Sequence, residues 1–193
     1  LAWALTELFD RRGHWHDWAA TAGLALDAAR RMDDRAWQAH LHRGHARADV
    51  WLGNTHSAHA HAHRAIDLYR EVGDRIGLAH TYRTLCWSLG RQGAHREAAS
   101  NARTAVDLHR AAGDRAGQGL SLNSLGWQHA NLGEHILALR YCRQAVSLLR
   151  DAGDSRGVGY ALDSLGYIHH RLGEHTAAVA NYRRAITLFR QTG

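Results

Sequence analysis

The chain has 193 residues, of which 45% are hydrophobic and 22% are charged, an ordinary globular composition. No apolar run is long enough to span a membrane and no signal peptide is recognisable, so we expect a cytoplasmic protein without a membrane partner. The net charge of +6 would permit nucleic-acid binding, but the 24 basic residues, all arginine, are dispersed, so we expect no direct contact with nucleic acid.

A 40-residue repeat organises the whole sequence. The stretch Leu122–His135 (LNSLGWQHANLGEH) is identical to Leu162–His175 (LDSLGYIHHRLGEH) at nine of its fourteen positions. We number the positions of the repeat from 1 to 40, starting at the first residue. Such a period predicts stacked units of the same local structure. The repeats are 1–40, 41–80, 81–120, 121–160 and 161–193.

Recurring capping residues divide each repeat into two helices. Repeat position 34 is Asp wherever the chain reaches it, and Asp accepts hydrogen bonds from the free amides of a first helical turn. Position 13 is Gly in all five repeats and position 33 is Gly in four, as expected where a helix ends in a left-handed turn. The first helix of each pair should run from about position 35 to position 12 of the next repeat, and the second from about position 15 to 32. In chain order, after a helix that ends near residue 12, the predicted segments are 15–32, 35–52, 55–72, 75–92, 95–112, 115–132, 135–152, 155–172 and 175–192.

Small residues recur where the helices should meet. Position 18 is Ala in the last four repeats, and a bulky side chain there would hold the helices apart. The first repeat has Trp18 at this position, so we expect it to be atypical, as terminal repeats usually are. Cys86 and Cys142 fall at small core positions and are predicted to be buried free thiols in a reducing compartment.

The segment LGYIHHRLGEHTAAVANYRRAI, residues 165–186, resembles a tetratricopeptide repeat. The resemblance implies an all-α, right-handed superhelical solenoid of antiparallel helix pairs, with residues 1–193 forming a single domain and the first helices lining a concave groove. The chain begins with Leu, so we expect a fragment of a longer protein. The sequence also resembles the repeat regions of actinobacterial antibiotic-regulatory (SARP-type) and NTPase-linked transcriptional regulators. This resemblance implies a regulatory or sensor role in bacteria.

One stripe of the first helices varies while the core positions repeat. Its Asn residues could pair with a peptide backbone, its Arg residues with carboxylates, and its aromatic residues could supply flat apolar contacts. Alternatively, the aromatic residues at position 7 pack between adjacent first helices and the arginines are merely solvated. The predicted groove residues are Arg43, Arg47, His80, Arg83, Trp87, Arg91, Asn123, Trp127, Asn131, Tyr160, Asp163, Tyr167, His170 and Arg171.

Seventeen histidines raise the question of a metal site. The densest run, HSAHAHAHR, offers His56, His59 and His63 at helical spacing, which can chelate zinc or nickel. No Asp, Glu or Cys within the run completes a ligand set, so we predict no metal site and no cofactor. Of the adjacent pair His169 and His170, we expect the first in the core and the second in the groove.

No sequence signature of an enzyme is present: the chain lacks a phosphate-binding glycine loop, a nucleophile elbow and an HExxH motif. The sequence therefore predicts a non-enzymatic module that binds a protein or peptide segment in its groove. Two alternatives stay open: a sensor of a small anionic or sugar effector, and a scaffold that self-associates through the exposed ends of its solenoid.

Overall fold

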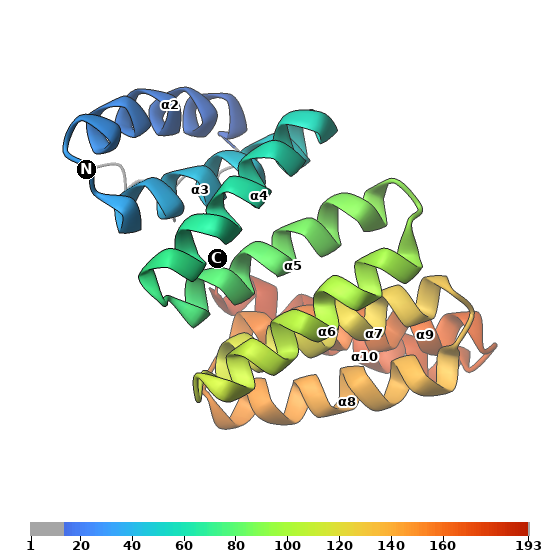
Figure 1. The fold of residues 1–193 in the computed structure, drawn as a ribbon. Coiled ribbons are helices and arrows are strands. Elements are labelled where there is room, and N and C mark those ends of the chain that lie inside the picture. The colour runs from blue at the N-terminus through green and yellow to red at the C-terminus, as the bar shows by residue number, and fades with distance from the viewer. Residues whose placement is uncertain (1–13, 193) are drawn as a thin grey trace. The chain divides into compact units, whose positions relative to one another are not determined.

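The computed structural model describes residues 14–192, and over this range the chain is entirely helical, without a strand (Figure 1). Every predicted helix from residue 15 onward is present, with ends that agree within one residue. The predicted helix end near residue 12, Gly13 and Gly193 lie outside the described residues. The helices are α2 (Trp15–Arg31), α3 (Arg35–Leu52), α4 (Thr55–Val72), α5 (Arg75–Arg91), α6 (His95–Ala111), α7 (Arg115–Asn131), α8 (His135–Asp151), α9 (Ser155–Arg171) and α10 (His175–Thr192).

The capping residues act as the sequence predicts. The carboxylate of Asp34 accepts a hydrogen bond from the backbone N–H of Trp37 at 2.9 Å, and Asp154 does the same for Gly157 at 2.8 Å. At the other end of the helices, Gly53 has φ +80° and satisfies the left-handed turn that ends α3. Asp33 occupies the corresponding position after α2 with φ +50°, a conformation that costs an Asp less than most residues.

The chain divides into two compact units, and the boundary between them lies within α5. The first unit ends at Ser88 and the second begins at Leu89. In the first unit α2 packs on α3, and α3 on α4; in the second, α6 to α10 contact each other in chain order, and α7 also contacts α9. The core of the second unit is built around Leu125, Leu149 and Ile168, which are almost fully buried. No described helix has both the length and the apolar character needed to cross a membrane.

Helix pairs approach closely where a small residue faces a larger one. A Cβ atom on Gly126 of α7 would lie 2.5 Å from the Sγ atom of Cys142 on α8, and a Cβ on Gly166 would lie 2.7 Å from the ring of Tyr182. Both glycines hold repeat position 6. Glycine is therefore required where the facing side chain is larger than Ala, because the interior has no room for both. The thiols of Cys86 and Cys142 are free and buried, as predicted.

Candidate functional site

Apart from Arg91 on α5, the predicted groove residues of the second unit lie on α7 and α9, two helices that contact each other. All of them are exposed or half-buried, so none is lost to the core. The adjacent histidines are buried and exposed as predicted, His169 being buried and His170 exposed. We call these residues the α7–α9 surface: Asn123, Trp127, Asn131, Tyr160, Asp163, Tyr167, His170 and Arg171.

Trp127 and Tyr167 form the centre of the α7–α9 surface. Both hold repeat position 7, and their ring centroids are 4.8 Å apart at an interplanar angle of 44°. Trp127 nevertheless exposes 36% of its surface. These aromatic rings thus pack between adjacent first helices, as the alternative interpretation of position 7 held, and part of the Trp127 surface stays exposed.

The two asparagines of α7 already use part of their hydrogen-bonding capacity within the protein. The side-chain oxygen of Asn123 accepts a hydrogen bond from the thiol of Cys142 at 3.6 Å, and the side-chain nitrogen of Asn131 donates to the backbone oxygen of Trp127 at 2.7 Å. Each amide keeps a second N–H or a second lone pair for a ligand, because an Asn side chain has two donors and an oxygen that can accept twice.

On α9, Tyr160 is held by a ring of α10 and by an arginine of its own helix. The Tyr160 ring packs against Phe189 with centroids 5.2 Å apart, and its hydroxyl accepts a hydrogen bond from Arg156 at 3.2 Å. Partial burial raises the pKa of the Asp163 carboxyl. The pKa of Tyr182 on α10 is raised mainly by burial and further by Asp163 and Tyr167. Tyr182 therefore adjoins the α7–α9 surface, although it was not among the residues predicted from the sequence.

In the first unit, the predicted residues lie on α3 and α5. Arg43 donates from Nε to the hydroxyl of Tyr69 at 3.3 Å, and its Nη2 atom lies 3.3 Å from Nδ1 of His40. This arginine therefore ties α3 to α4 as well as facing solvent. The remaining predicted residues are half-buried or exposed: Arg47, His80, Arg83 and Trp87, with Arg91 on the same helix but in the second unit.

Four tryptophans form a continuous ladder in the first unit. The ring centroids of Trp18 and Trp15 are 6.0 Å apart, those of Trp15 and Trp51 are 5.2 Å apart, and those of Trp51 and Trp87 are 5.9 Å apart. Trp51 and Trp87 expose 40% and 46% of their surfaces. The sequence prediction included only Trp87. Its signal was available, because tryptophan moves from position 15 to 11 to 7 in successive repeats.

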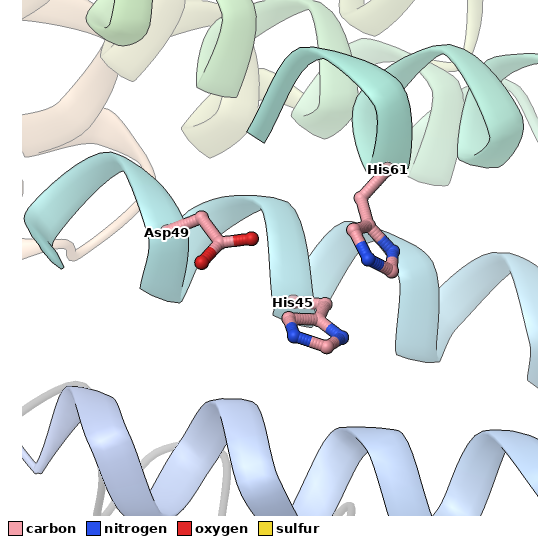
Figure 2. Close-up of side chains that lie close together, drawn as sticks. All are labelled: His45, Asp49 and His61. Atoms are coloured by element: carbon pink, nitrogen blue, oxygen red, sulfur yellow. The ribbon is translucent and has the colours of Figure 1, made fainter. Parts of the chain in front are cut away.

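Among the described residues, His56, His59 and His63 do not form a metal-ligand set, although His61 of the same run takes part in one. His56 and His63 are exposed, and Nε2 of His59 is 3.0 Å from the hydroxyl of Ser88. A different set comes together in the first unit, where one potential ligand atom from each of His45, Asp49 and His61 lies within 4.8 Å of the others. Figure 2 shows His61 pointing from α4 toward His45 on α3, with Asp49 one turn further along α3. Sequence reasoning missed this cluster because its members are on two helices.

Histidine rings crowd around this cluster. His45 stacks on His61 with centroids 4.0 Å apart, and Nδ1 of His61 lies 2.8 Å from Nδ1 of His42. Burial lowers the pKa of His45 and His61, against an opposing effect of Asp49 on both. Burial, then His61 and the nearby arginines, lowers the pKa of His42 to about 4. The three imidazoles are therefore neutral near pH 7.

Comparison with known proteins places the fold. A model of the tetratricopeptide repeat family matches residues 118–191. No curated protein matches the sequence significantly. Two solved structures resemble it. BtubC (BKLC) from P. vanneervenii is 18% identical, with a TM-score of 0.76 and coverage of 92% of this chain and 74% of that one. A Rap protein complexed with Competence and Sporulation Factor is 16% identical, with a TM-score of 0.85 and coverage of 95% of this chain and 51% of that one.

A third similar structure contains nearly identical repeats. It is a Podosopora anserina protein of the kinesin light chain type with TPR-like repeats, 13% identical, with a TM-score of 0.68 and coverage of 98% of this chain and 93% of that one. At these identities the likeness concerns the fold, which is an all-α solenoid of repeated helix pairs. The chain spans about half the length of the Rap protein, 51%.

Proposed function

Since the chain carries a tetratricopeptide repeat domain, a kind of domain that generally mediates protein–protein interactions, we propose that it is a non-enzymatic module that binds an extended protein or peptide segment along its first helices. The observation that carries this proposal is the partly exposed Trp127–Tyr167 pair of the α7–α9 surface. Aromatic residues of this kind supply most of the binding free energy at interfaces, because they bury a large area at a small entropic cost.

The charges around this pair indicate what the segment would look like. Asp163 lies one turn before Tyr167 on α9, and Arg171 lies one turn after it, so opposite charges flank the aromatic centre. A segment with an apolar or aromatic side chain between a basic and an acidic residue would match this order. Rim charges of this type set orientation and association rate more than they set affinity.

A wider context extends the proposal. The Rap structure is that of a protein in complex with a factor, and this chain corresponds to about half of such a protein. We propose that the repeats are the regulatory or sensor region of a bacterial transcriptional regulator in the cytoplasm, in keeping with the arginine-only basic composition and the 40-residue repeat. The coding sequence next to this region tests this context, since a winged-helix or P-loop segment would support it and an unrelated domain would contradict it.

The binding proposal is tested by screening a peptide library against the full chain and measuring the affinity of the best peptide. We expect Trp127→Ala and Tyr167→Ala each to weaken it by at least about tenfold, roughly 1.4 kcal/mol. Ile136→Ala is the matched control, because Ile136 is an apolar residue of the same unit that is 77% exposed on α8, outside the surface. Equal losses in all three variants, or no loss in the first two, would reject the α7–α9 surface as the binding site.

A pocket in the second unit favours a second candidate, the binding of a small anionic effector. Its volume is about 430 Å³, and apolar side chains line it together with three arginines, Arg150, Arg183 and Arg184. Arginine pairs well with carboxylate or phosphate. Screening of anionic metabolites by thermal shift tests this candidate: a hit whose stabilisation disappears in Arg183→Ala supports effector binding, and the absence of any hit contradicts it.

A further inference from the structure

The second repeat replaces recurring apolar core residues with polar ones. Position 5 is Leu in the three later repeats, but it is His45 in the second. Position 2 is Tyr or Leu in the same three repeats, but it is His42 in the second. Position 9, which is Leu or His in the later repeats, is Asp49. His42 and His45 thus replace apolar residues, and Asp49 puts a carboxylate where the later repeats have Leu or His. These changes along one face of α3 weaken the apolar core, so they call for a compensating role.

The replaced residues converge with a residue of α4. His45 and Asp49 are one turn apart on α3, and His61 approaches them from α4 (Figure 2). One nitrogen or oxygen atom of each residue lies within 4.8 Å of the corresponding atoms of the other two. All three residues belong to the first unit. Two imidazole nitrogens and one carboxylate oxygen at this spacing can converge on one ion through small side-chain rotations.

Two observations set this cluster apart from an ordinary group of polar residues. Asp49 exposes only 3% of its surface, and its carboxylate accepts hydrogen bonds from the neutral side chains of Ser57 and Asn54, which leave its negative charge in place for a nearby cation. The Nδ1 atom of His45 is buried and makes no hydrogen bond within the protein. A buried polar atom in this condition indicates a partner that is not part of the chain, such as a water molecule or an ion.

We propose that His45, Asp49 and His61 bind a divalent transition-metal ion, for which Zn²⁺ is the natural probe, and that the ion joins α3 to α4. Three protein ligands leave a fourth tetrahedral position for water. The site is distinct from the α7–α9 surface and does not depend on peptide binding. His56, His59 and His63, the candidates of the histidine run, have no part in it.

The surroundings of the ligands support the assignment. The hydroxyl of Ser57 donates to one carboxylate oxygen of Asp49 at 2.6 Å, and the side-chain nitrogen of Asn54 donates to the other at 3.0 Å. His42 contacts His61 through a ring nitrogen at 2.8 Å. Such contacts orient ligating groups in metal sites.

Isothermal titration of the full chain with Zn²⁺ tests the site. We expect one ion per chain, and an affinity that falls more than about 100-fold in His45→Leu, since even outer contacts are worth about 10- to 100-fold. Ser57→Ala should weaken binding by about tenfold, because it removes only a contact that orients Asp49. His45→Leu restores the residue of the later repeats, so it should fold, which circular dichroism in the presence of a chelator verifies.

The matched control is the double variant His56→Ala/His63→Ala, which alters the exposed histidine run and leaves the cluster intact. It should retain the affinity for Zn²⁺ and the increase in melting temperature that the ion produces, whereas His45→Leu should lose both. Co²⁺ provides a second measurement, since its visible absorption reports coordination by the site and should vanish in His45→Leu alone. Binding that survives in His45→Leu and disappears in the double variant would overturn the proposal and show adventitious binding by the run.

Discussion

The ring of Trp18 lies against Gly44, and a Cβ atom on that glycine would be 3.0 Å from the indole nitrogen of Trp18. The other four repeats have Ala where the first has Trp18, and the later three have Thr or Ser where the second has Gly44. Trp18 is 5% exposed, so it remains a core residue despite its size. The first repeat is thus atypical, as expected. The large side chain of Trp18 is compensated on the facing helix by Gly44, which has no side chain.

This compensation predicts that the two residues are energetically coupled. Gly44→Ser should lower the free energy of unfolding by about 1–3 kcal/mol, because it overpacks the space next to a buried ring. Trp18→Ala alone should cost about 3–5 kcal/mol through the cavity that it leaves. The double variant recreates the pair of the later repeats and should cost less than the sum. Urea unfolding of the three variants measures the coupling, and strictly additive effects would contradict it.

A similar coupling is predicted between Gly126 and Cys142. Gly126→Ala should destabilise the second unit by about 1–3 kcal/mol, since the new methyl group would lie 2.5 Å from Sγ and 3.1 Å from the backbone oxygen of Ala138. Adding Cys142→Ala should recover most of this loss, because the second repeat carries the same pair as Ala46 and Ala62. Denaturant unfolding again provides the measurement; a double variant no more stable than Gly126→Ala would show that the backbone contact dominates.

His40 should make the first unit sensitive to acid. Burial, then the charge of Arg43, lowers the pKa of His40 from 6.5 to about 4, against a smaller opposing effect of Asp74. The unfolded chain takes up this proton near pH 6.5, before the folded chain does. The free energy of unfolding should therefore fall as the pH drops from about 6.5 to about 4, and this contribution should be complete above pH 6.5.

The variant His40→Leu isolates this contribution, and Leu120 shows that the same repeat position accepts Leu. Urea unfolding at several pH values, with a chelator present, should give a shallower dependence on pH for the variant than for the parent chain. Parallel curves for the two proteins would mean that His40 does not titrate with the expected difference between the folded and unfolded states.

Cys142 should be chemically inert in the folded protein. Burial raises the pKa of its thiol to about 12, and only the thiolate reacts quickly with disulfide reagents. The second cysteine of the chain, Cys86, is also buried. We expect both thiols to react with Ellman's reagent at a rate set by unfolding, and immediately in urea. Fast labelling of one thiol under native conditions would indicate that its helix pair opens locally.

The helix pattern was predictable from local signals alone. Asp114, for example, lies where a first helix must begin, and Gly133 lies where such a helix must end, so the boundaries follow from the capping of free backbone groups. The exposure of Trp127 also followed from its repeat position, because the stripe on one helix face has a fixed period.

The His45–Asp49–His61 cluster was harder to predict for a physical reason. Ligand spacing within one helix drew attention to His56, His59 and His63, whereas the cluster joins two helices whose mutual rotation depends on packing. A usable signal did exist, since His45 occupies a position that is Leu in the three later repeats. Comparison of core positions between repeats, rather than a search for dense histidines, would have found the polar face of α3.

The distribution of indoles provides an optical label for each unit. Six of the seven tryptophans precede Leu89, and four of them form the ladder from Trp18 to Trp87, so absorbed light can migrate between neighbouring rings before emission. Trp127 is the one indole after Leu89, and the variant Trp127→Phe would make the second unit dark. The difference between the spectra of the parent and this variant would then report the second unit by itself.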